Sequence, residues 1–508
     1  MLLLNPGNFM VSTFSMLRFW LYTTLEKWVV RSFDRSFEKD HLYQPANSFQ
    51  AYFAAFNPAD PALPQKVSEC SQPYFTLLTP EDTLERGVIE SLSSTEADIL
   101  YFDQKGQGNG SPCFLKPEWS PELWMNVDLL YGAVYRTAYV REMLIRFGAM
   151  GLAAAILNAN KIHHIPKVML QSKVFPWQSD PLRHQHAQTV IDFCKLQKIT
   201  PPPISYRPNG SLRFNWLPSS QLVSIIIPNR NQAGLLHRCL ASIYRLTSQA
   251  KYEIIVVDDH SQDPQTHALY RQYTEQKPNF RVIDGKMPFN FSRACNQGAQ
   301  VAQGDLLLFL NNDTEIISAS WLQNLVGWAN LPGVGAVGAK LLYPNGRVQH
   351  AGIVIGLEGH ASHVFLGIQG DPFTPYGHVD WTRNVSAVTA ACMLVPKDVF
   401  WKAGGFDEQF TIAFGDVDLS LRLQERGYRI VYAPDSVLIH HEGKSRRKYI
   451  PRSDIVAKKD YFLDKVARGD PYYHPDLSRA WRVPSLRWQG EQDPVERLKR
   501  IIQYLGKI

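Results

Sequence analysis

The most restrictive feature of this 508-residue sequence is a run of five apolar residues that ends in a polar cluster. Leu306 to Leu310 are too few to cross a bilayer and too uniformly apolar for a half-exposed strand, so they predict a buried central strand of a parallel sheet. Asn311, Asn312 and Asp313 follow directly, at the carboxyl end of that strand, where open α/β sheets bind their ligands. A carboxylate beside two amide side chains can hold a divalent cation there through oxygen. The alternative is a turn in which Asn and Asp only cap the next helix.

Composition limits the class of protein. A formal net charge of +6 is compatible with a diphosphate ligand or an anionic membrane surface, but is too small to indicate nucleic acid. The six cysteines are scattered without a Cys-x-x-Cys spacing, which predicts reduced thiols in a cytoplasmic protein, with no disulfide framework or zinc site. No apolar run reaches the roughly 18 to 20 residues of a transmembrane helix, and the N-terminus lacks the positive start of a secretory signal. We therefore expect a cytoplasmic protein.

Both ends of the chain have the pattern of basic, amphipathic helices. Residues 1–49 are interpreted as an amphipathic helical segment, with apolar and aromatic residues at helical spacing over residues 11–33. Residues 451–508 are interpreted as a C-terminal helical extension. Such helices either dock on their own protein or lie in a membrane interface as peripheral contacts with the cytoplasmic membrane face, and periodicity does not distinguish the two.

Two α/β units are indicated by the order of apolar runs and breaks. Residues 50–197 show strand patterns near Tyr74, Asp98 and Gly132, with helical stretches between them. A linker over residues 198–220 contains three consecutive prolines, which cannot continue a helix and predict a stiff spacer. The second unit, residues 221–450, has the clearer signals, and we expect the chemistry there.

The second unit opens with a strand, a helix and another strand, which predicts a parallel crossover unit. The first strand ends at Pro228, and the second runs into Asp258 and Asp259. Neither Gly-x-Gly-x-x-Gly nor Gly-Lys-Ser/Thr follows the first strand, so a dinucleotide oxidoreductase and a phosphate-loop ATPase lose their main support. Together with Asp313, these strand-end acids indicate a pocket for a nucleotide diphosphate.

Three further motifs contain candidate functional residues. Arg293 and Asn296, three apart, share a helical face between the acidic strand ends and are predicted to face the ligand; the alternative is a solvated helix. Asp416 opens a helix, where it is either a plain helix start or the general base of a reaction. His440 and its neighbour His441 precede a basic loop. An imidazole can complete a metal shell and a basic loop can neutralise phosphates, whereas the bland interpretation is a structural histidine and a solvated loop.

Residues of about 220 to 450 resemble a family-2 glycosyltransferase of the GT-A fold, a Rossmann-like nucleotide-diphospho-sugar transferase fold. The resemblance depends on seven motifs in the expected order: Val-Ser-Ile-Ile-Ile-Pro-Asn-Arg-Asn, Val-Val-Asp-Asp-His-Ser, Asn-Phe-Ser-Arg-Ala-Cys-Asn-Gln-Gly, Leu-Asn-Asn-Asp-Thr, Gly-Gly-Phe-Asp-Glu, Gly-Asp-Val-Asp-Leu and His-His-Glu-Gly. The chain is similar in particular to rhamnosyltransferase-like enzymes of bacterial O-antigen and other surface polysaccharide assembly.

The resemblance implies a role for each matching residue. Asp416 matches the catalytic base, and Asp313 and His440 match the ligands of a divalent cation, Mn²⁺ or Mg²⁺. The first place of the usual Asp-x-Asp is Asn311 here, and Gly415 stands where the family often has an acid. The nucleotide and donor contacts implied are Pro228, Asn229, Asn231, Asp258, Asp259, Arg293, Asn296, Asn311 and Asn312, and the supporting residues are Asp418, His441, Lys444 and Arg446.

The implied activity is inverting transfer of a sugar from a nucleotide-diphosphate donor to a hydroxyl of a glycan or polyprenyl-linked glycan, with no role for nucleic acid. The first unit resembles only the later part of this fold. It lacks the opening strand with its Pro-Asn motif and the Asp-Asp-x-Ser strand end, so it is interpreted as a partial, degenerate, non-catalytic GT-A-like unit. A sugar-nucleotide nucleotidyltransferase and a non-catalytic carbohydrate-binding scaffold are the rival hypotheses.

Overall fold

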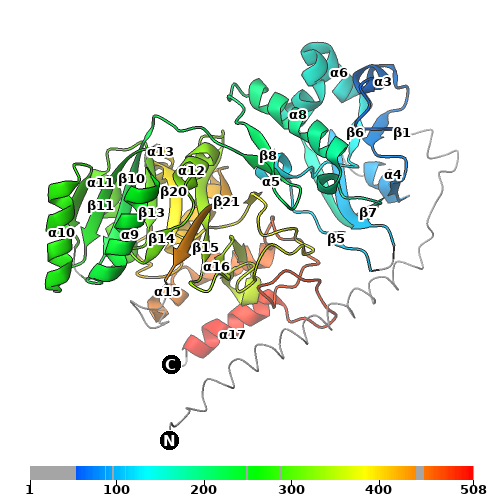
Figure 1. The fold of residues 1–508 in the computed structure, drawn as a ribbon. Coiled ribbons are helices and arrows are strands. Elements are labelled where there is room, and N and C mark those ends of the chain that lie inside the picture. The colour runs from blue at the N-terminus through cyan, green and yellow to red at the C-terminus, as the bar shows by residue number, and fades with distance from the viewer. Residues whose placement is uncertain are drawn as a thin grey trace, which may run out of the picture.

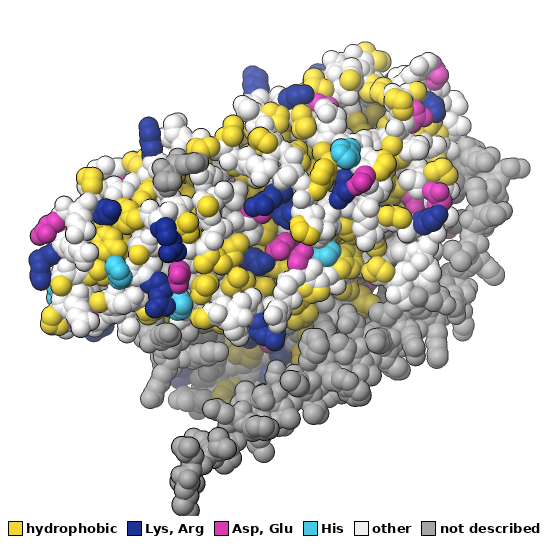
Figure 2. All heavy atoms as spheres, viewed as in Figure 1, with side chains coloured by type: hydrophobic (Ala, Val, Ile, Leu, Met, Phe, Trp, Pro, Cys, Tyr) yellow, Lys and Arg dark blue, Asp and Glu magenta, His cyan; other side chains and the backbone are white. Residues whose placement is uncertain are grey.

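Two α/β units lie side by side in the structure, a computed structural model that describes residues 53–85, 87–93, 96–108, 110–247, 250–286, 288–441 and 451–506. The chain after residue 451 runs along the second unit and reaches the first (Figure 1). The predicted N-terminal helical segment, Lys444 and Arg446 lie outside the described residues. On the face seen in Figure 2, basic and acidic side chains are interspersed, as the small net charge suggests.

The second unit is built on a ten-stranded mixed sheet with the central order β12-β11-β10-β13-β20-β15-β21-β14. The predicted apolar run is its strand β13, and all five residues are buried. This strand runs parallel to β10 but antiparallel to β20, so the expected parallel sheet covers only half of the unit. The strands are β10 (Leu222–Asn229), β11 (Lys251–Asp258), β12 (Phe280–Asp284), β13 (Leu306–Leu310), β14 (Thr314–Ile316), β15 (Val334–Leu342), β16 (Val348–His350), β19 (Arg383–Asn384), β20 (Cys392–Pro396) and β21 (Arg429–His440).

Helices cover both faces of this sheet because its strands are apolar on both sides. Ile225 and Ile227 pack with α9 on one face, and Ile226 between them packs with α11 on the other. Gly298 lets α11 approach closely, since a Cβ there would lie 2.4 Å from Ile226 Cγ2. The helices are α9 (Ala233–Leu246), α10 (Pro264–Gln276), α11 (Phe291–Val301), α12 (Trp321–Ala329), α13 (Lys397–Lys402) and α14 (Gly415–Glu425); a small hairpin of β17 (Ile353–Ile355) and β18 (Ala361–His363), joined by η3 (Leu357–Gly359), stands beside them.

The first unit repeats the second in topology. Its sheet has the order β1-β2-β6-β4-β7-β3, and each neighbouring pair has the same relative direction as in β10-β13-β20-β15-β21-β14. The side strand β5 pairs with β4 as β16 pairs with β15. Its elements are β1 (Phe53–Phe56), α3 (Leu63–Glu69), β2 (Tyr74–Leu77), β3 (Thr83–Leu84), α4 (Gly87–Ser93), β4 (Ile99–Gly106), β5 (Cys113–Phe114), α5 (Pro121–Asn126), β6 (Val134–Arg136), α6 (Thr137–Phe147), η1 (Gly148–Met150), α7 (Gly151–Asn158), β7 (Ile162–Ser172), η2 (Pro176–Gln178) and α8 (Asp180–Leu196).

The copy departs from the second unit where the chemistry is expected. The prediction that its opening strand is missing is wrong, because β1 takes the place of β10 and ends before Asn57. Counterparts of β11 and β12 are absent, since residues 57–73 between β1 and β2 contain only α3. Residues 148–150 join α6 to α7, whereas residues 403–414 join the corresponding α13 and α14. Where Thr314 pairs with His440, the corresponding Thr83 pairs with Gln171.

The two units are docked through buried polar contacts and the linker. The linker contains an antiparallel hairpin of β8 (Ile204–Tyr206) and β9 (Leu212–Phe214), so it is more ordered than a proline spacer. Phe214 packs edge-on against Trp328 of the second unit. Glu122 of the first unit is 1% exposed and binds the Arg429 guanidinium of the second at 2.7 Å. The units therefore form one packed body.

The C-terminal segment packs on the second unit. It contains α15 (Arg452–Val456), α16 (Lys459–Arg468) and α17 (Pro494–Gly506). Leu498 of α17 is buried, and Val495 and Ile502 pack on the same apolar cluster. Part of the apolar side of this helix thus packs on its own protein, which is one of the two predicted alternatives. Among the described residues no helix is long and apolar enough to span a membrane.

Removal of the Glu122 carboxylate should weaken the docking of the two units. We expect Glu122→Ala to lower the free energy of unfolding by about 3 kcal/mol, because it leaves the Arg429 charge and the Asn384 amide at the interface without their acceptor. Urea denaturation followed by circular dichroism measures this change. The control is Arg146→Ala, which removes an exposed ion pair with Glu142 and should change the value by less than about 0.5 kcal/mol. Equal effects of the two substitutions would contradict the docking role.

Candidate active site

The predicted strand-end residues line one cleft of about 880 Å³ in the second unit. Asp259 follows β11, Asp313 follows β13, Asp416 begins α14 and His440 ends β21, and all four line the cleft. Its position at the carboxyl ends of β10, β11 and β13 is the ligand-binding edge of an open α/β sheet. Pro228, Asn229, Asn231, Asn311 and Asn312, predicted as donor contacts, line it as well.

A chain of hydrogen bonds fixes the three strand ends relative to one another. The Asn312 amide donates to Asn229 Oδ1 at 2.6 Å, and the Asn229 amide donates to the Tyr270 hydroxyl at 2.7 Å. Tyr270 in turn donates to Asp258 Oδ1 at 2.7 Å. Asp258 also accepts the backbone N–H of Ser261 at 3.1 Å. The network joins the ends of β13, β10 and β11 through the Tyr270 hydroxyl.

The loops after β10 and β11 are held in uncommon conformations. Asn231, Gln232 and His260 have φ of 54°, 60° and 52°, in the left-handed region that costs free energy for residues other than glycine. Asn231 Oδ1 accepts the backbone N–H groups of Gln262 at 2.8 Å and Asp263 at 3.0 Å, so the two loops support each other. Left-handed residues held by such contacts are a recurrent feature of ligand-binding loops.

The two acids after β11 have different surroundings. Asp258 does not line the cleft, because its carboxylate is occupied by Tyr270 and Ser261. Asp259 does line the cleft, and Arg230 lies 3.4 Å from its carboxylate. Burial raises the pKa of Asp259, although Arg230 opposes the shift. Of the pair, Asp259 is available to a ligand and Asp258 positions the loop.

Asp313, Asn311 and His440 converge at one side of the cleft. His440 Nε2 lies 3.0 Å from Asp313 Oδ1 and 3.3 Å from the Asn311 amide nitrogen. The backbone pairing of Thr314 with His440 and the bond from His441 N–H to the Asp313 carbonyl, 2.9 Å, fix this arrangement. Burial opposes ionisation of Asp313, but its polar surroundings outweigh burial, so the pKa of Asp313 is lowered and the group is ionised.

The donor set at this point fits a divalent cation. Asp313 Oδ1 and Asn311 Oδ1 are both buried and have no hydrogen-bond partner. Buried oxygens without partners are costly, and a hard cation is a ligand that would satisfy both. His440 Nδ1 is engaged by Gln349, which leaves Nε2 facing the same point. One carboxylate, one amide oxygen and one imidazole nitrogen are a ligand set that Mn²⁺ or Mg²⁺ accepts.

Asp416 lies on the wall of the cleft at the start of α14. Its Oδ2 accepts the backbone N–H of Ala390 at 3.0 Å and its Oδ1 accepts that of Val417 at 2.9 Å. Burial raises the pKa of Asp416 and these backbone donors oppose the shift. The preceding Phe414 has φ of 64°, which turns the chain sharply into the helix. A carboxylate of raised pKa facing a ligand cleft is suited to accept a proton.

Four predicted residues make their contacts outside the cleft. Arg293 and Asn296 do not line the cleft; both bind Glu408, and Asn296 also exchanges hydrogen bonds with the Phe406 backbone. Their contacts hold the loop before α14 and give no support to donor binding. Asp418 is fully buried and binds Arg422 at 2.7 Å and Lys458 at 2.6 Å. His441 lies 3.2 Å from Glu315.

The C-terminal segment contributes residues that the sequence did not indicate. Asp454 of α15 accepts three consecutive backbone N–H groups, from Thr411 at 3.1 Å, Ile412 at 2.7 Å and Ala413 at 2.9 Å. Ile412 and Ala413 line the cleft, and so does Arg482 from the same segment. Neither Asp454 nor Arg482 belongs to a recognisable motif, so only tertiary structure identifies them.

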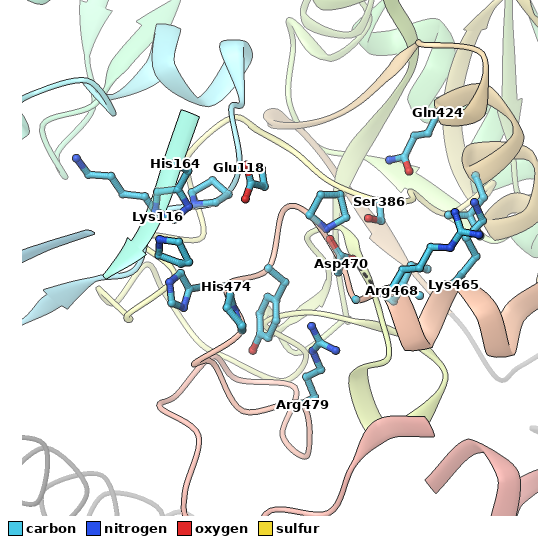
Figure 3. A pocket seen from close by; sticks show the side chains of 18 residues that line it. Lys116, Glu118, His164, Ser386, Gln424, Lys465, Arg468, Asp470, His474 and Arg479 are labelled. Carbon is cyan, nitrogen blue, oxygen red and sulfur yellow. Dashed lines mark hydrogen bonds between the residues drawn. The ribbon is translucent and has the colours of Figure 1, made fainter. Parts of the chain in front are cut away.

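A second pocket of about 520 Å³ lies where the two units meet the C-terminal segment. Lys116, Glu118 and His164 of the first unit line it together with Arg479 and His474 of the C-terminal segment (Figure 3). At its edge, His164 Nε2 lies 3.0 Å from Asp103 Oδ1 and His474 Nε2 lies 2.9 Å from Asp103 Oδ2. All three side chains are buried, and their ligand atoms lie within 4.8 Å of one another, as in a metal site.

Proton positions argue against a metal ion at Asp103. The backbone N–H of Asp476 donates to His474 Nδ1 at 3.0 Å, so in the neutral ring Nε2 carries the hydrogen and points to Asp103. A metal would need the lone pair of Nε2 instead. Asp103 Oδ1 also accepts the Lys116 N–H at 2.8 Å. We call this cluster the Asp103 clamp: the His164 ring is hydrogen-bonded to Asp103 Oδ1, His474 lies 2.9 Å from Oδ2, and the contacts tie the C-terminal segment to the first unit.

Comparison with known proteins gives the following similarities. Residues 224–404 match the family model for Glycosyl transferase family 2. "O-antigen biosynthesis protein RfbC" of Myxococcus xanthus is 34% identical over 476 residues, which cover 85% of this chain and 36% of that protein. "N-acetylglucosaminyl-diphospho-decaprenol L-rhamnosyltransferase" of Mycobacterium tuberculosis is 27% identical over 278 residues, 50% of this chain and 84% of that protein. The chain thus spans about a third of the length of the first relative.

A solved structure, "Mannosyltransferase PcManGT from Pyrobaculum calidifontis in complex with GDP-Man and Mn2+", covers 51% of this chain and 68% of its own at 19% identity. Its TM-score of 0.35 is too low to support a conclusion about this chain. The family match and the sheet topology confirm the GT-A class of α/β fold that was predicted for the second unit.

Loss of the Asp103 carboxylate should destabilise the protein without changing its metal content. We expect Asp103→Ala to lower the free energy of unfolding by about 3 kcal/mol, because the His164 ring and the backbone N–H of Lys116 lose a buried acceptor. Equilibrium dialysis against Zn²⁺ should give the same uptake for variant and wild type. Loss of one bound zinc per chain in the variant would show that the cluster is a metal site after all.

Proposed function

From the premise that residues 224–404 form a family-2 glycosyltransferase domain, we propose that this protein is an inverting glycosyltransferase. It transfers a sugar from a nucleotide-diphosphate donor to a hydroxyl of a glycan or lipid-linked glycan in cell-surface polysaccharide synthesis. The observation that carries the proposal is the convergence of Asp259, Asp313, Asp416 and His440 on one cleft. The two relatives named above act in O-antigen and rhamnosyl transfer by their names, and they support the acceptor class proposed here.

The donor is bound at the ends of β10, β11 and β13. Asp259 and the ordered loop around Asn231 are placed to accept hydrogen bonds from the base and ribose. Asn312, held by Asn229, lies between this loop and Asp313. The diphosphate therefore lies toward the side of the cleft where Asp313 and His440 converge.

Asp313, His440 and Asn311 would hold the cation, Mn²⁺ or Mg²⁺. When bound, such an ion neutralises negative charge on the diphosphate leaving group. The chain's own part is to present one ionised carboxylate and one neutral imidazole at a fixed separation, through the β14 and β21 pairing. Because these two strands are part of the main sheet, the separation does not depend on a mobile loop.

Asp416 acts as the general base. The carboxylate takes the proton of the acceptor hydroxyl while that oxygen forms a bond to the anomeric carbon, and the bond from this carbon to the diphosphate oxygen breaks. Attack opposite the leaving group inverts the anomeric configuration. The backbone donors from Ala390 and Val417 keep the carboxylate oriented toward the cleft during the transfer.

The reaction is proposed to take place on the cytoplasmic side. All six cysteines are free thiols, as expected in a reducing compartment. The apolar side of α17 packs on the protein itself, which explains the amphipathic pattern of that helix. The proposal of peripheral membrane contact is therefore based on a lipid-linked acceptor and not on α17.

Product analysis distinguishes this proposal from its rivals. The full chain is incubated with a panel of sugar nucleotides and Mn²⁺, with a glycan acceptor extract, and the released nucleotide is measured. A glycosyltransferase releases a nucleoside diphosphate, a nucleotidyltransferase releases pyrophosphate from a nucleoside triphosphate, and a binding scaffold releases neither. Release of nucleoside diphosphate from none of the donors would contradict the proposal.

Replacing the Asp416 carboxylate should stop transfer and spare donor binding. We expect Asp416→Asn to lower turnover by about 10²- to 10⁴-fold, the usual contribution of a general base, with a donor Kd within about twofold of wild type. Turnover and calorimetric donor binding are the two measurements. In the wild type, activity should fall as the pH drops through the Asp416 pKa, which burial raises above 3.8, because only the ionised form accepts a proton. Wild-type turnover in the variant would refute the assignment.

Replacing Asp313 should weaken cation and donor binding together. We expect Asp313→Ala to lower Mn²⁺ affinity by about 10-fold or more, because it removes the carboxylate ligand of the proposed cation site. The donor Kd should rise in the presence of Mn²⁺ and change little in its absence. Calorimetry with and without Mn²⁺ measures both. The control Asp398→Ala removes an exposed acid paired with Lys402 and should leave both affinities unchanged.

A further inference from the structure

We infer that Gln349 is a positioning residue that fixes His440 in the tautomer able to bind a cation. The inference rests on the proposed function, since it concerns the same cation site. Gln349 is part of β16 and is 4% exposed, and its position follows from the pairing of β16 with β15 at the edge of the cleft. Nothing in the sequence motifs points to it.

The contact between Gln349 and His440 determines where the ring hydrogen lies. Gln349 Oε1 is 2.8 Å from His440 Nδ1, and an amide oxygen can only accept a hydrogen bond. The hydrogen of the neutral ring is therefore on Nδ1, and the lone pair is on Nε2. The Asn311 amide, 3.3 Å from Nε2, donates to this lone pair and agrees with the same tautomer.

The lone pair of Nε2 faces a carboxylate oxygen. Asp313 Oδ1 lies 3.0 Å away and has no hydrogen-bond partner, although it is buried. Two electron-rich atoms at this distance repel each other unless a positive charge lies beside both. A divalent cation supplies that charge, and the unpartnered Asn311 Oδ1 provides a third ligand atom.

The Asp103 clamp shows what the opposite tautomer does. His474 Nδ1 accepts a backbone N–H, so its Nε2 carries the ring hydrogen and lies 2.9 Å from Asp103 Oδ2. The two histidines have similar distances to a carboxylate, and they differ in the partner of the far ring nitrogen. Because Gln349 accepts at Nδ1, His440 keeps on Nε2 the lone pair that a cation needs. Because a backbone N–H donates to Nδ1, His474 has a hydrogen on Nε2 instead.

Mn²⁺ titration of the full chain tests the inference. Free Mn²⁺ is followed by electron paramagnetic resonance in the wild type, Gln349→Leu and Gln349→Glu, without donor or acceptor. We expect Gln349→Leu to weaken Mn²⁺ binding about 10- to 100-fold, as loss of a contact behind a metal ligand does. Gln349→Glu keeps an acceptor for Nδ1–H and should bind Mn²⁺ at least as tightly as the wild type. The control Gln424→Leu removes a side-chain hydrogen bond to the Val385 carbonyl at a residue that does not line the cleft, and should change nothing.

The outcomes separate this inference from the proposed function. If the wild type binds no Mn²⁺, the cation site itself fails. If the wild type binds Mn²⁺ and Gln349→Leu binds it equally well, or if Gln349→Glu weakens binding more than 10-fold, the role of Gln349 is overturned while the cation site stands. Circular dichroism of each variant tests whether it is folded. If Gln349→Leu does not fold, the Mn²⁺ affinity of Gln349→Glu decides the question alone.

Discussion

Pairing between β14 and β21 is the constraint on which the site depends. This short antiparallel ladder places Thr314 opposite His440, and the His441 N–H closes it on the Asp313 carbonyl. The side chains of Asp313 and His440, which are 127 positions apart in the chain, thereby approach to 3.0 Å. Backbone hydrogen bonds are insensitive to side-chain identity, so the ladder keeps this meeting point fixed while the surrounding side chains determine what it binds. The same ladder exists in the first unit between Thr83 and Gln171, without an imidazole.

The repeated topology separates a shared framework from the elements particular to the second unit. Both units contain the same six-strand path, and this path supplies a core. Among the described residues, the strands β11 and β12, with their acidic strand end, and the long connection before α14 belong to the second unit. The proposed site therefore combines Asp313 and His440 of the shared path with elements outside it, and the first unit offers buried surface and the Glu122 contact.

Local signals in the sequence predicted many of the strands and the residues that the structure brings to one cleft. Five consecutive apolar residues predicted β13, strand ends indicated Asp259, Asp313 and His440, and a helix start indicated Asp416. The antiparallel insertion of β20 could not be predicted, because direction depends on connections between distant segments. Arg293 and Asn296 share the expected helical face, but Glu408 captures both. The contact of Gln349 with His440 could not be predicted, because it depends on the register with which β16 pairs with β15.

Arg482 and Asp454 place the tail of the chain within the wall of the cleft. The family match, residues 224–404, thus covers part of the cleft and leaves out these contacts. An exchange of segments with a related protein would have to include the C-terminal segment together with the core. An exchange that stops at the matched residues would leave the loop at residues 411–413 without the Asp454 carboxylate, and one wall of the cleft would be incomplete.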